Sequence, residues 1–314
     1  MVNDMSRKTF KTLDEQIEIL RTRGLVITDE EKAKDVLLRE NYFFISGYRH
    51  LFMKSSKDKN FISGTTFEEL YAMFVFDRRV RNIFFKNLLI IENNIKSLIS
   101  YQLSKKYGYK EKEYLNPKNF TKDPMKSRQV YDVLNKVKRQ IRVNGKQHSA
   151  TMHYINNYGY IPLWILVKVL SFGIVGELYD ILDETDQMEI AKIYNLDVES
   201  LAIYLSILSN YRNLCAHEDI LYNHRTQKVI PDTRYHYLLN IDMTDDEYNY
   251  GKNDLFSVVI IMKQLLTDNE FREFINEVGY EIDILEGKTN ILPINNFLNK
   301  IGFPDNWRDI IELD

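Results

Sequence analysis

From Phe67 to about Tyr107 the chain contains neither glycine nor proline. Apolar residues recur along this stretch at three- and four-residue spacing, as they do on one face of an α-helix. They are Leu70, Phe74, Val80, Phe84, Leu88, Ile91, Ile95 and Leu98, with Val75 and Phe76 filling the widest gap. The pattern predicts one long amphipathic helix, or two helices stacked end to end, that ends at Gly108.

The composition favours helices elsewhere as well. The 314 residues include 12 glycines and 6 prolines, about half the usual share of these turn-forming residues. Apolar residues make up 44% of the chain and charged residues 28%, which is typical of a globular protein and excludes a disordered or fibrous one. We therefore expect long helices rather than many short strands.

Three capping boxes, in which a threonine precedes a glutamate by three residues, mark helix starts. They pair Thr12 with Glu15, Thr28 with Glu31 and Thr66 with Glu69. The first two predict a helical hairpin at the N-terminus, with Gly24 ending its first helix. The aromatic-rich segment from Asn41 to Met53 has Gly47 in its middle and predicts a short strand pair or a packed irregular segment.

Helical periodicity returns further along the chain. The ranges are about 127–143, 163–182, 198–217 and 255–277, followed by a segment at 293–301. The helix at 127–143 is expected to stop at Asn144-Gly145, and Pro162 stands at a first-turn position of the next helix. The stretch 221–252 is rich in Tyr and Asp and has weak periodicity.

Several classes of protein are excluded. No stretch approaches about 18 consecutive apolar residues, so no transmembrane helix and no membrane partner are expected. The first residues lack the apolar segment of a secretory signal. The single cysteine excludes an internal disulfide and a CxxC zinc frame, and a reducing cytoplasm is the default expectation.

One segment carries residues suited to chemistry, Leu208 to Arg225. Within it Arg212 is followed by Asn213 and, five residues on, by His217. This spacing alone is a weak signal, but here the three polar residues fall off an apolar helical stripe. The stripe comprises Leu205, Leu208, Tyr211, Leu214 and Cys215.

On an ideal helix Arg212 and His217 lie about 140° apart, with a rise of about 7.5 Å between them. They therefore act together only if the arginine bends toward the imidazole, if the helix begins or bends inside the motif, or if two copies of the helix meet across a twofold axis. All three arrangements stay open at the level of the sequence.

Histidine exchanges protons near pH 7, and arginine offers a fork of donors matched to a phosphate. Without a carboxylate cluster or a glycine-rich loop, this set fits cleavage of RNA, in which the ribose 2′-hydroxyl attacks its own phosphate. No metal or other cofactor is expected, since RNA brings its own nucleophile. The structural alternative is that Arg212 pairs with an acid such as Glu92 while His217 satisfies a carbonyl.

Cys215, His217, Asp219 and His224 offer a further alternative, a metal-binding cluster. We disfavour it, because the first two residues point to different sides of a helix. Charge supports a polyanionic partner instead. From Lys118 to Lys146 there are nine Lys or Arg against two acids, whereas from Glu177 to Glu199 there are eight acids against one Lys. Two solvated helix faces explain the same pattern.

An RNA-cleaving protein needs a nonspecific electrostatic grip. The preferred RNA-tracking surface comprises Lys136, Lys138, Arg139 and Arg142. Arg78 and Arg81, near the start of the long helix, are further candidates for holding phosphates, although a solvated face accounts for them equally well.

The segment YRNLCAH at 211–217 resembles the signature of the HEPN superfamily of helical RNA-cleaving domains, an arginine four to six residues before a histidine. The wider chain resembles the Abi-like (abortive infection, AbiD/AbiF group) family of bacterial phage-defence proteins. The blocks that carry this resemblance are RTRGLVI (21–27), NYFFISGYRHLF (41–52), GTTFEELYAMFVFDRRVR (64–81), IPLWILVKVLSFGIVGELY (161–179) and IGFPDNW (301–307).

This resemblance implies an all-α fold with a HEPN-like helical bundle core at 65–240. An N-terminal helical hairpin and aromatic segment (1–64) precede the core, and a C-terminal helical segment (241–314) follows it. It also implies a ribonuclease toxin that acts on infection, a homodimer, and RNA as substrate and as a small structured regulatory partner. The catalytic role is carried onto Arg212 and His217, with Asn213 in support.

The sequence departs from the family at Glu218, where a second histidine is frequent. If two imidazoles are required, the second comes from a dimer mate or from His224. The departure also favours an alternative of another class: a non-catalytic RNA-binding or protein-interaction module of a toxin–antitoxin or defence system.

Overall fold

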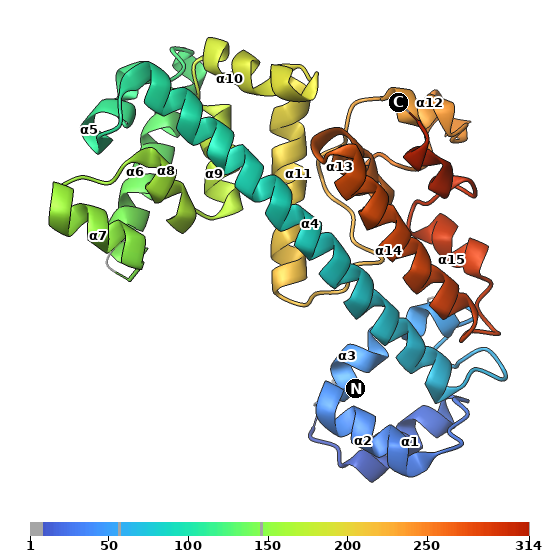
Figure 1. Ribbon diagram of the computed structural model, residues 1–314. Helices are drawn as coiled ribbons and strands as arrows, with labels where there is room; N and C mark the ends of the chain where they lie inside the picture. The colour runs from blue at the N-terminus through green and yellow to red at the C-terminus, as the bar shows by residue number, and fades with distance from the viewer. Residues whose placement is uncertain (1–8, 56–57, 145–146, 314) are drawn as a thin grey trace, which may run out of the picture. The chain divides into compact units, whose positions relative to one another are not determined.

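The computed structural model describes residues 9–55, 58–144 and 147–313. Fifteen α-helices, six short 3₁₀ helices and one two-stranded ribbon make up the regular structure of these residues, which confirms the all-α class. Figure 1 shows their arrangement within each unit. The chain forms two compact units. One contains the chain up to Arg81 together with Asn276–Lys300, and the other contains Asn82–Ile275 together with the C-terminal segment from Ile301.

The long helix predicted from the sequence is present as one element, α4 (Phe67–Tyr107). It begins at the Thr66 capping box, where the hydroxyl of Thr66 accepts from the backbone of Glu69 and the Glu69 carboxylate accepts from that of Thr66. It ends at Gly108, whose φ of 97° suits a residue without a side chain. Residues of α4 belong to both units.

The first unit is built from short helices. They are α1 (Leu13–Thr22), α2 (Glu30–Glu40), α3 (Tyr42–Ser46), the 3₁₀ turn η1 (Arg49–Phe52) and α15 (Ile294–Lys300), with the first part of α4 and the end of α14 (Asp268–Glu286). The capping box of Thr12 and Glu15 is formed as predicted.

Two predictions for this unit are wrong. Asp29, not Thr28, caps α2, because its carboxylate accepts from the Lys32 backbone at 3.0 Å. The segment 41–53 forms α3 and η1 rather than a strand pair or an irregular segment. There Asn41 accepts from the Phe43 backbone and starts a new helix directly after α2.

The second unit holds the remaining elements. They are α5 (Glu111–Tyr114), η2 (Pro117–Asn119), η3 (Pro124–Lys126), α6 (Ser127–Asn144), α7 (Ser149–Tyr158), α8 (Leu163–Leu166), η4 (Val167–Val169), α9 (Phe172–Asp180), α10 (Glu184–Ala191), η5 (Lys192–Tyr194), α11 (Val198–Ala216), α12 (Arg234–Leu238), β1 (Met243–Thr244), β2 (Glu247–Tyr248), α13 (Leu255–Leu265) and η6 (Trp307–Ile311). The ribbon β1–β2 is antiparallel, with Met243 opposite Tyr248.

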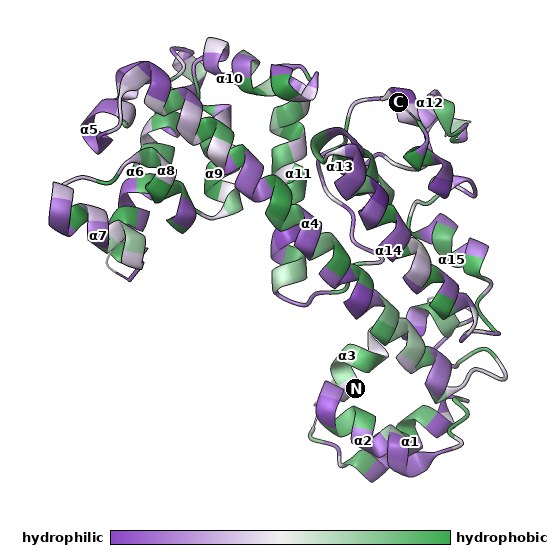
Figure 2. Ribbon diagram, in the orientation of Figure 1, coloured by the Kyte–Doolittle hydropathy of each residue, from purple (hydrophilic) through white to green (hydrophobic). Residues whose placement is uncertain are grey.

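Helix α11 is central to the core of this unit. It packs against α9, α10 and α13, and α9 packs in turn on α6. Apolar residues run along most of its length (Figure 2). The predicted helix at 127–143 is confirmed as α6, whose last residue is Asn144, while Gly145 lies outside the described residues.

Two predicted helices are broken in the structure. The helix expected at 163–182 is divided into α8, η4 and α9, because Ser171 caps a new helix by accepting from the Ile174 backbone. The helix expected at 255–277 is divided at Leu266, which is extended. Thr267 then starts α14 by a reciprocal hydrogen-bond pair with Glu270. Among the helices of the described ranges, none is both long and apolar enough to cross a membrane.

Asp254, which caps α13, gives the second unit a pH-dependent stability. Its carboxylate accepts from the backbones of Gly251 and Ser257, both at 3.0 Å, although the residue is only 3% exposed. Burial raises the pKa of Asp254 to about 6, whereas an unfolded Asp titrates near about 3.9. The folded state therefore holds this proton more tightly than the unfolded state, and stability falls as pH rises between these two values.

Asp254→Asn is expected to remove this dependence while keeping the capping oxygen. The full shift corresponds to about 3 kcal/mol, of which about 2 kcal/mol falls between pH 4.5 and pH 7, so the loss of unfolding free energy over this range should be smaller in the variant by about 2 kcal/mol. Urea denaturation at the two pH values measures it, with the exposed Asp132→Asn as control. Equal pH dependence in parent and Asp254→Asn would contradict the assignment.

Candidate functional site

The candidate site lies on the last turns of α11, whose start and inner face fix its position. The Asp197 carboxylate caps the helix by accepting from the backbone and hydroxyl of Ser200, at 2.7 and 2.6 Å. The apolar stripe predicted from the sequence is buried. The exposed fractions are 0% for Leu205, Leu208 and Tyr211, 8% for Leu214 and 6% for Cys215. The polar residues of the motif are thereby left outside the core.

Arg212 lies against α4. Its Nε donates to the Glu92 carboxylate at 3.1 Å, and Glu92 also accepts from Lys96 at 2.7 Å. The guanidinium lies 5.9 Å from the centroid of the Phe85 ring. The pairing with Glu92 that the sequence offered as the structural alternative is thus present. The Arg212 side chain is nevertheless 27% exposed, and its terminal amino groups form no hydrogen bond with another described residue.

His217 follows the last residue of α11 and is exposed. Its backbone N–H closes the helix by donating to the Asn213 carbonyl at 3.0 Å. Within the described ranges, the imidazole has no hydrogen bond or ion pair, so it satisfies no carbonyl there. Asn213, one turn earlier on the same side, is exposed as well.

Arg212 and His217 point to different sides of one helix. Helix α11 starts at Val198 and runs unbroken to Ala216, so it does not begin inside the motif. The helical offset of about 140° therefore holds. Asn213 and His217 share a face, and Arg212 lies on the side that meets α4.

The turn after His217 is unusual because a glutamate occupies it. Glu218 has a φ of 58°, in the left-handed region that glycine or asparagine commonly fills at a helix end. Its N–H donates to the Cys215 carbonyl, and the Asp219 N–H donates to that of Leu214. These two bonds complete a Schellman motif. No glycine marks this helix end in the sequence, but the end predicted at about residue 217 is correct within one residue.

His224, the other imidazole nearby, has partners. Its Nε2 lies 2.5 Å from the Asn210 carboxamide oxygen, and its ring meets the Tyr211 ring edge-to-face at 4.9 Å. Burial, chiefly, lowers the pKa of His224 and favours the neutral ring. Asn210 stands seven residues before His217, a rise of about 10 Å. His224 is therefore held about two turns away from His217.

The basic residues predicted to bind RNA phosphates differ in whether they form ion pairs within the protein. Lys136 pairs with Glu177 at 2.7 Å. Lys138, Arg139 and Arg142 are exposed on α6 and have no ion pair with a described residue. Arg78 donates twice to Glu40, at 2.9 and 3.0 Å.

Arg81 requires a correction. It is 3% exposed and pairs with the buried Asp77 at 3.0 Å. Packing around α4 therefore removes its guanidinium from any phosphate at the surface, and we no longer include Arg81 among the candidate RNA contacts. The sequence could not separate it from its neighbours, because charged residues at 78, 79 and 81 look alike without their tertiary surroundings.

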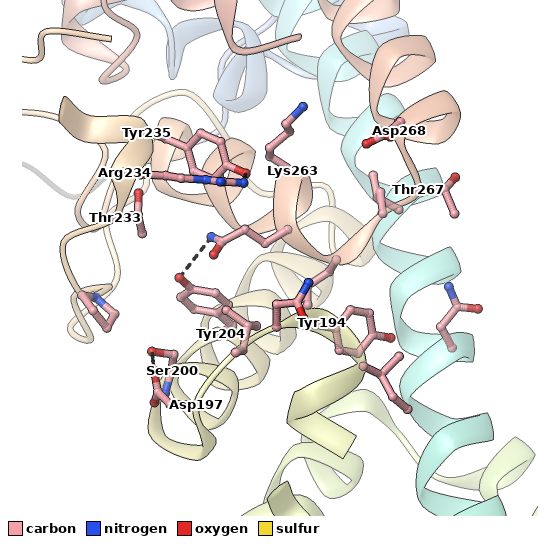
Figure 3. Close-up of a pocket in the computed structure, with 18 of the residues that line it drawn as sticks. Tyr194, Asp197, Ser200, Tyr204, Thr233, Arg234, Tyr235, Lys263, Thr267 and Asp268 are labelled. Atoms are coloured by element: carbon pink, nitrogen blue, oxygen red, sulfur yellow. Dashed lines mark hydrogen bonds between the residues drawn. The ribbon is translucent and has the colours of Figure 1, made fainter. Parts of the chain in front are cut away.

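A cavity of about 1050 Å³ opens at the other end of α11 (Figure 3). It is bounded by α4, the start of α11, the segment 231–235 and the junction of α13 with α14. Tyr204 accepts a hydrogen bond from Gln264 across it at 3.1 Å. Arg234 and Lys263 also line it. No residue of the Arg212–His217 motif does, so this cavity is separate from the candidate site, and the sequence had not indicated it.

The described residues contain no group of three or more His, Cys, Asp or Glu placed to hold a metal ion. Fold and site together define an all-α protein whose central helix ends in an exposed histidine and asparagine on one side and a half-buried arginine on the side that meets α4. A family model described as Abi-like protein matches residues 35–223. The match covers more than half of the chain and includes the whole of α11.

The chain therefore belongs to the Abi-like protein family, as its sequence blocks predicted. The name refers to abortive infection, the phage-defence response. The RTRGLVI block at 21–27 and the IGFPDNW block at 301–307 lie outside the matched range. No curated protein and no solved structure gave a match.

Proposed function

We propose that this protein acts in abortive infection as a metal-independent endoribonuclease toxin, with Arg212 and His217 as catalytic residues and Asn213 in support. The observation that carries the proposal is the state of the two side chains at the end of α11. The imidazole is exposed without a partner in the described part of the chain, and the guanidinium is fixed at Nε only.

Each side chain has a role in cleavage by the 2′-hydroxyl. His217 takes the proton of that hydroxyl or gives one to the leaving 5′-oxygen. Arg212 stabilises the extra negative charge on the phosphate in the transition state. Glu92 orients the guanidinium through Nε, and the two terminal amino groups are left to form a bidentate contact with phosphate oxygens. The exposed carboxamide of Asn213 is placed to orient the imidazole or the RNA.

A second copy of the chain completes the site in this proposal. The helical offset keeps Arg212 and His217 of one copy on different sides, and His224 is held about two turns from His217. Two copies of α11 meeting across a twofold axis would supply two histidines and two arginines to one cleft. The partner's histidine then serves as the second proton carrier in place of Glu218.

The grip on RNA is assigned to α6. Lys138, Arg139 and Arg142 are exposed there and unpaired within the described ranges. Contacts with phosphates release counterions and so supply affinity without sequence preference. Lys136 and Arg78 are retained as weaker candidates, because each is already neutralised by a glutamate.

A second function deserves a test, since the Arg212–Glu92 pair favours it. In that reading the motif arginine stabilises the packing of α11 on α4, and the protein is a non-catalytic RNA-binding or protein-interaction module of a defence system. Binding of RNA without turnover would support this alternative.

The nature of the cleavage products tests the proposal directly. Purified full-length protein, incubated with a mixed pool of cellular RNA in EDTA, is expected to produce fragments with 2′,3′-cyclic phosphate ends. These ends follow because the 2′-oxygen itself displaces the leaving group. Cleavage that stops in EDTA, or that leaves only 3′-hydroxyl ends, would contradict the mechanism.

A further inference from the structure

A chain of aromatic rings lies on the surface of the second unit, around α7. Tyr154 and Tyr158 have ring centroids 5.3 Å apart, Tyr158 and Tyr160 6.2 Å, and Tyr160 and Tyr109 5.4 Å. His153 adds an edge contact to Tyr154 at 5.8 Å. We call these five residues the aromatic platform.

Tyr158 and Tyr109 are the exposed tyrosines of the platform, whereas Tyr154 and Tyr160 are half-buried. The exposed fractions are 57% for Tyr158 and 45% for Tyr109. The hydroxyls of its four tyrosines make no hydrogen bond to another described residue. Buried tyrosines of the same unit differ, since Tyr114 donates to the Ile161 carbonyl at 2.6 Å and Tyr179 to that of Gln187 at 3.3 Å. The exposed side chains of Tyr109 and Tyr158 therefore present ring surface and a hydroxyl to solvent.

Core packing does not explain α7. Of its ten residues, Ser149–Tyr158, only Thr151 is buried. A short helix normally owes its stability to an apolar face buried on its neighbours. Here much of the aromatic surface of the helix faces outward instead, which is characteristic of a binding surface.

The charge around the platform suits a polyanion. From Val133 to Gly176 the chain contains no Asp or Glu, and this stretch includes all of α7 and most of α6. The Lys110 ammonium lies 5.7 Å from the Tyr109 ring centroid and 5.6 Å from that of Tyr160. Two carboxylates lie close by and are engaged by backbone groups, since Glu111 accepts from the Ile161 N–H at 2.6 Å and Glu113 from that of Lys110 at 3.1 Å. A lysine against the rings, next to a stretch without acids, favours an anionic partner such as a phosphate backbone.

We propose that the aromatic platform binds single-stranded RNA, with bases stacked on Tyr109 and Tyr158 and the backbone held by Lys110. The inference rests on the proposed function only in naming RNA as the ligand. Bases stack on side chains when they are unpaired and splayed, whereas a duplex hides their faces. The rings are inclined to one another by 38–57°, so they form a bent path rather than one flat stack. Such a path suits a flexible strand.

Binding is measured on full-length protein carrying His217→Ala, so that the RNA stays intact. The probes are a fluorescein-labelled oligouridine and a labelled RNA duplex, followed by fluorescence anisotropy at constant salt. Tyr158→Ala and Tyr109→Ala should each weaken oligouridine binding by about fivefold or more, the lower end expected for loss of one base–aromatic stack. Tyr158→Phe keeps the ring and should bind within about twofold of the parent.

Tyr237→Ala is the matched control, because Tyr237 is 74% exposed on α12 and is not part of the platform. Thermal melting followed by circular dichroism verifies that each variant is folded. The proposal is overturned if the alanine variants bind oligouridine like the parent, if Tyr158→Phe loses as much as Tyr158→Ala, or if the duplex binds at least as well as the single strand. Reduced self-association with unchanged RNA binding would assign the platform to a second copy of the chain and overturn it too.

The test separates this inference from the endoribonuclease proposal. Suppose that the platform variants bind RNA more weakly, and that the protein with His217 intact cleaves no RNA. This result would support RNA binding by the platform and contradict the endoribonuclease proposal. If the native chain cleaves RNA and the platform variants bind RNA normally, the endoribonuclease proposal would be supported and the platform proposal contradicted.

Discussion

Replacing His217 with alanine is expected to lower the rate of RNA cleavage by about 10²–10⁴-fold, the contribution of one positioned acid or base. Growth arrest on expression should be lost with it. The fold should survive, because the side chain is exposed and touches no partner in the described ranges. The unfolding free energy should therefore change by no more than about 0.5 kcal/mol, as for other surface substitutions. Initial cleavage rates and urea denaturation curves measure the two effects.

His50→Ala provides the matched control, since His50 is another exposed histidine and lies in the first unit. It should leave both cleavage and growth arrest unchanged. If His217→Ala remains as toxic as the parent at equal protein levels, the assignment of the catalytic residue is wrong.

Arg212 calls for a different substitution, because its side chain also holds α11 against α4. In Arg212→Ala the buried Glu92 keeps only Lys96 as an ion-pair partner among the described residues. The unfolding free energy should then fall by about 1–3 kcal/mol. Arg212→Lys retains the charge but loses the bidentate fork. It should remain folded with cleavage reduced by about 10²–10³-fold, and a lysine variant with full activity would instead favour the packing role.

The parts of the fold that were predicted correctly from the sequence are those determined by local patterns, namely apolar spacing and helix capping. The long helix α4, its start at Thr66 and the apolar stripe of α11 follow from spacing and capping alone. The break before α14 was also encoded locally, by Thr267 and Glu270, but the apolar periodicity continued across it and masked the signal. When apolar periodicity and capping residues predict different helix boundaries, the boundary is determined by tertiary packing, which the sequence does not show.

The environment of the site residues depended on contacts between distant segments. The pairing of Arg212 with Glu92 joins positions 120 residues apart, and the sequence offered it only as one alternative. The burial of Arg81 and the position of His224 beside Asn210 had no local signal. The aromatic platform combines α7 with Tyr109 and Tyr160, so no single stretch of sequence displays it.

Gly302→Ala is expected to destabilise the protein by at least about 3 kcal/mol. Gly302 has a φ of 90°, and a Cβ built there would lie 2.2 Å from both Cγ and Oδ2 of Asp254. Asp254 cannot move away without giving up the backbone groups of Gly251 and Ser257 that it accepts from. The added methyl group therefore meets a carboxylate that is fixed by the cap of α13. Urea denaturation at pH 7 measures the loss.

Gly159→Ala separates this collision from the cost of backbone conformation. Gly159 has a similar φ of 74° at the end of α7, but a Cβ there would meet nothing within 4 Å. It should cost only about 1–2 kcal/mol, the usual penalty of the left-handed region. If the two variants lose equal stability, the Gly302 Cα lies farther from the Asp254 carboxylate than it does in the structure. A larger loss of stability for Gly302→Ala would show that the C-terminal segment packs tightly against the start of α13. The level of folded protein in cells should then fall as well, although the site on α11 is unchanged.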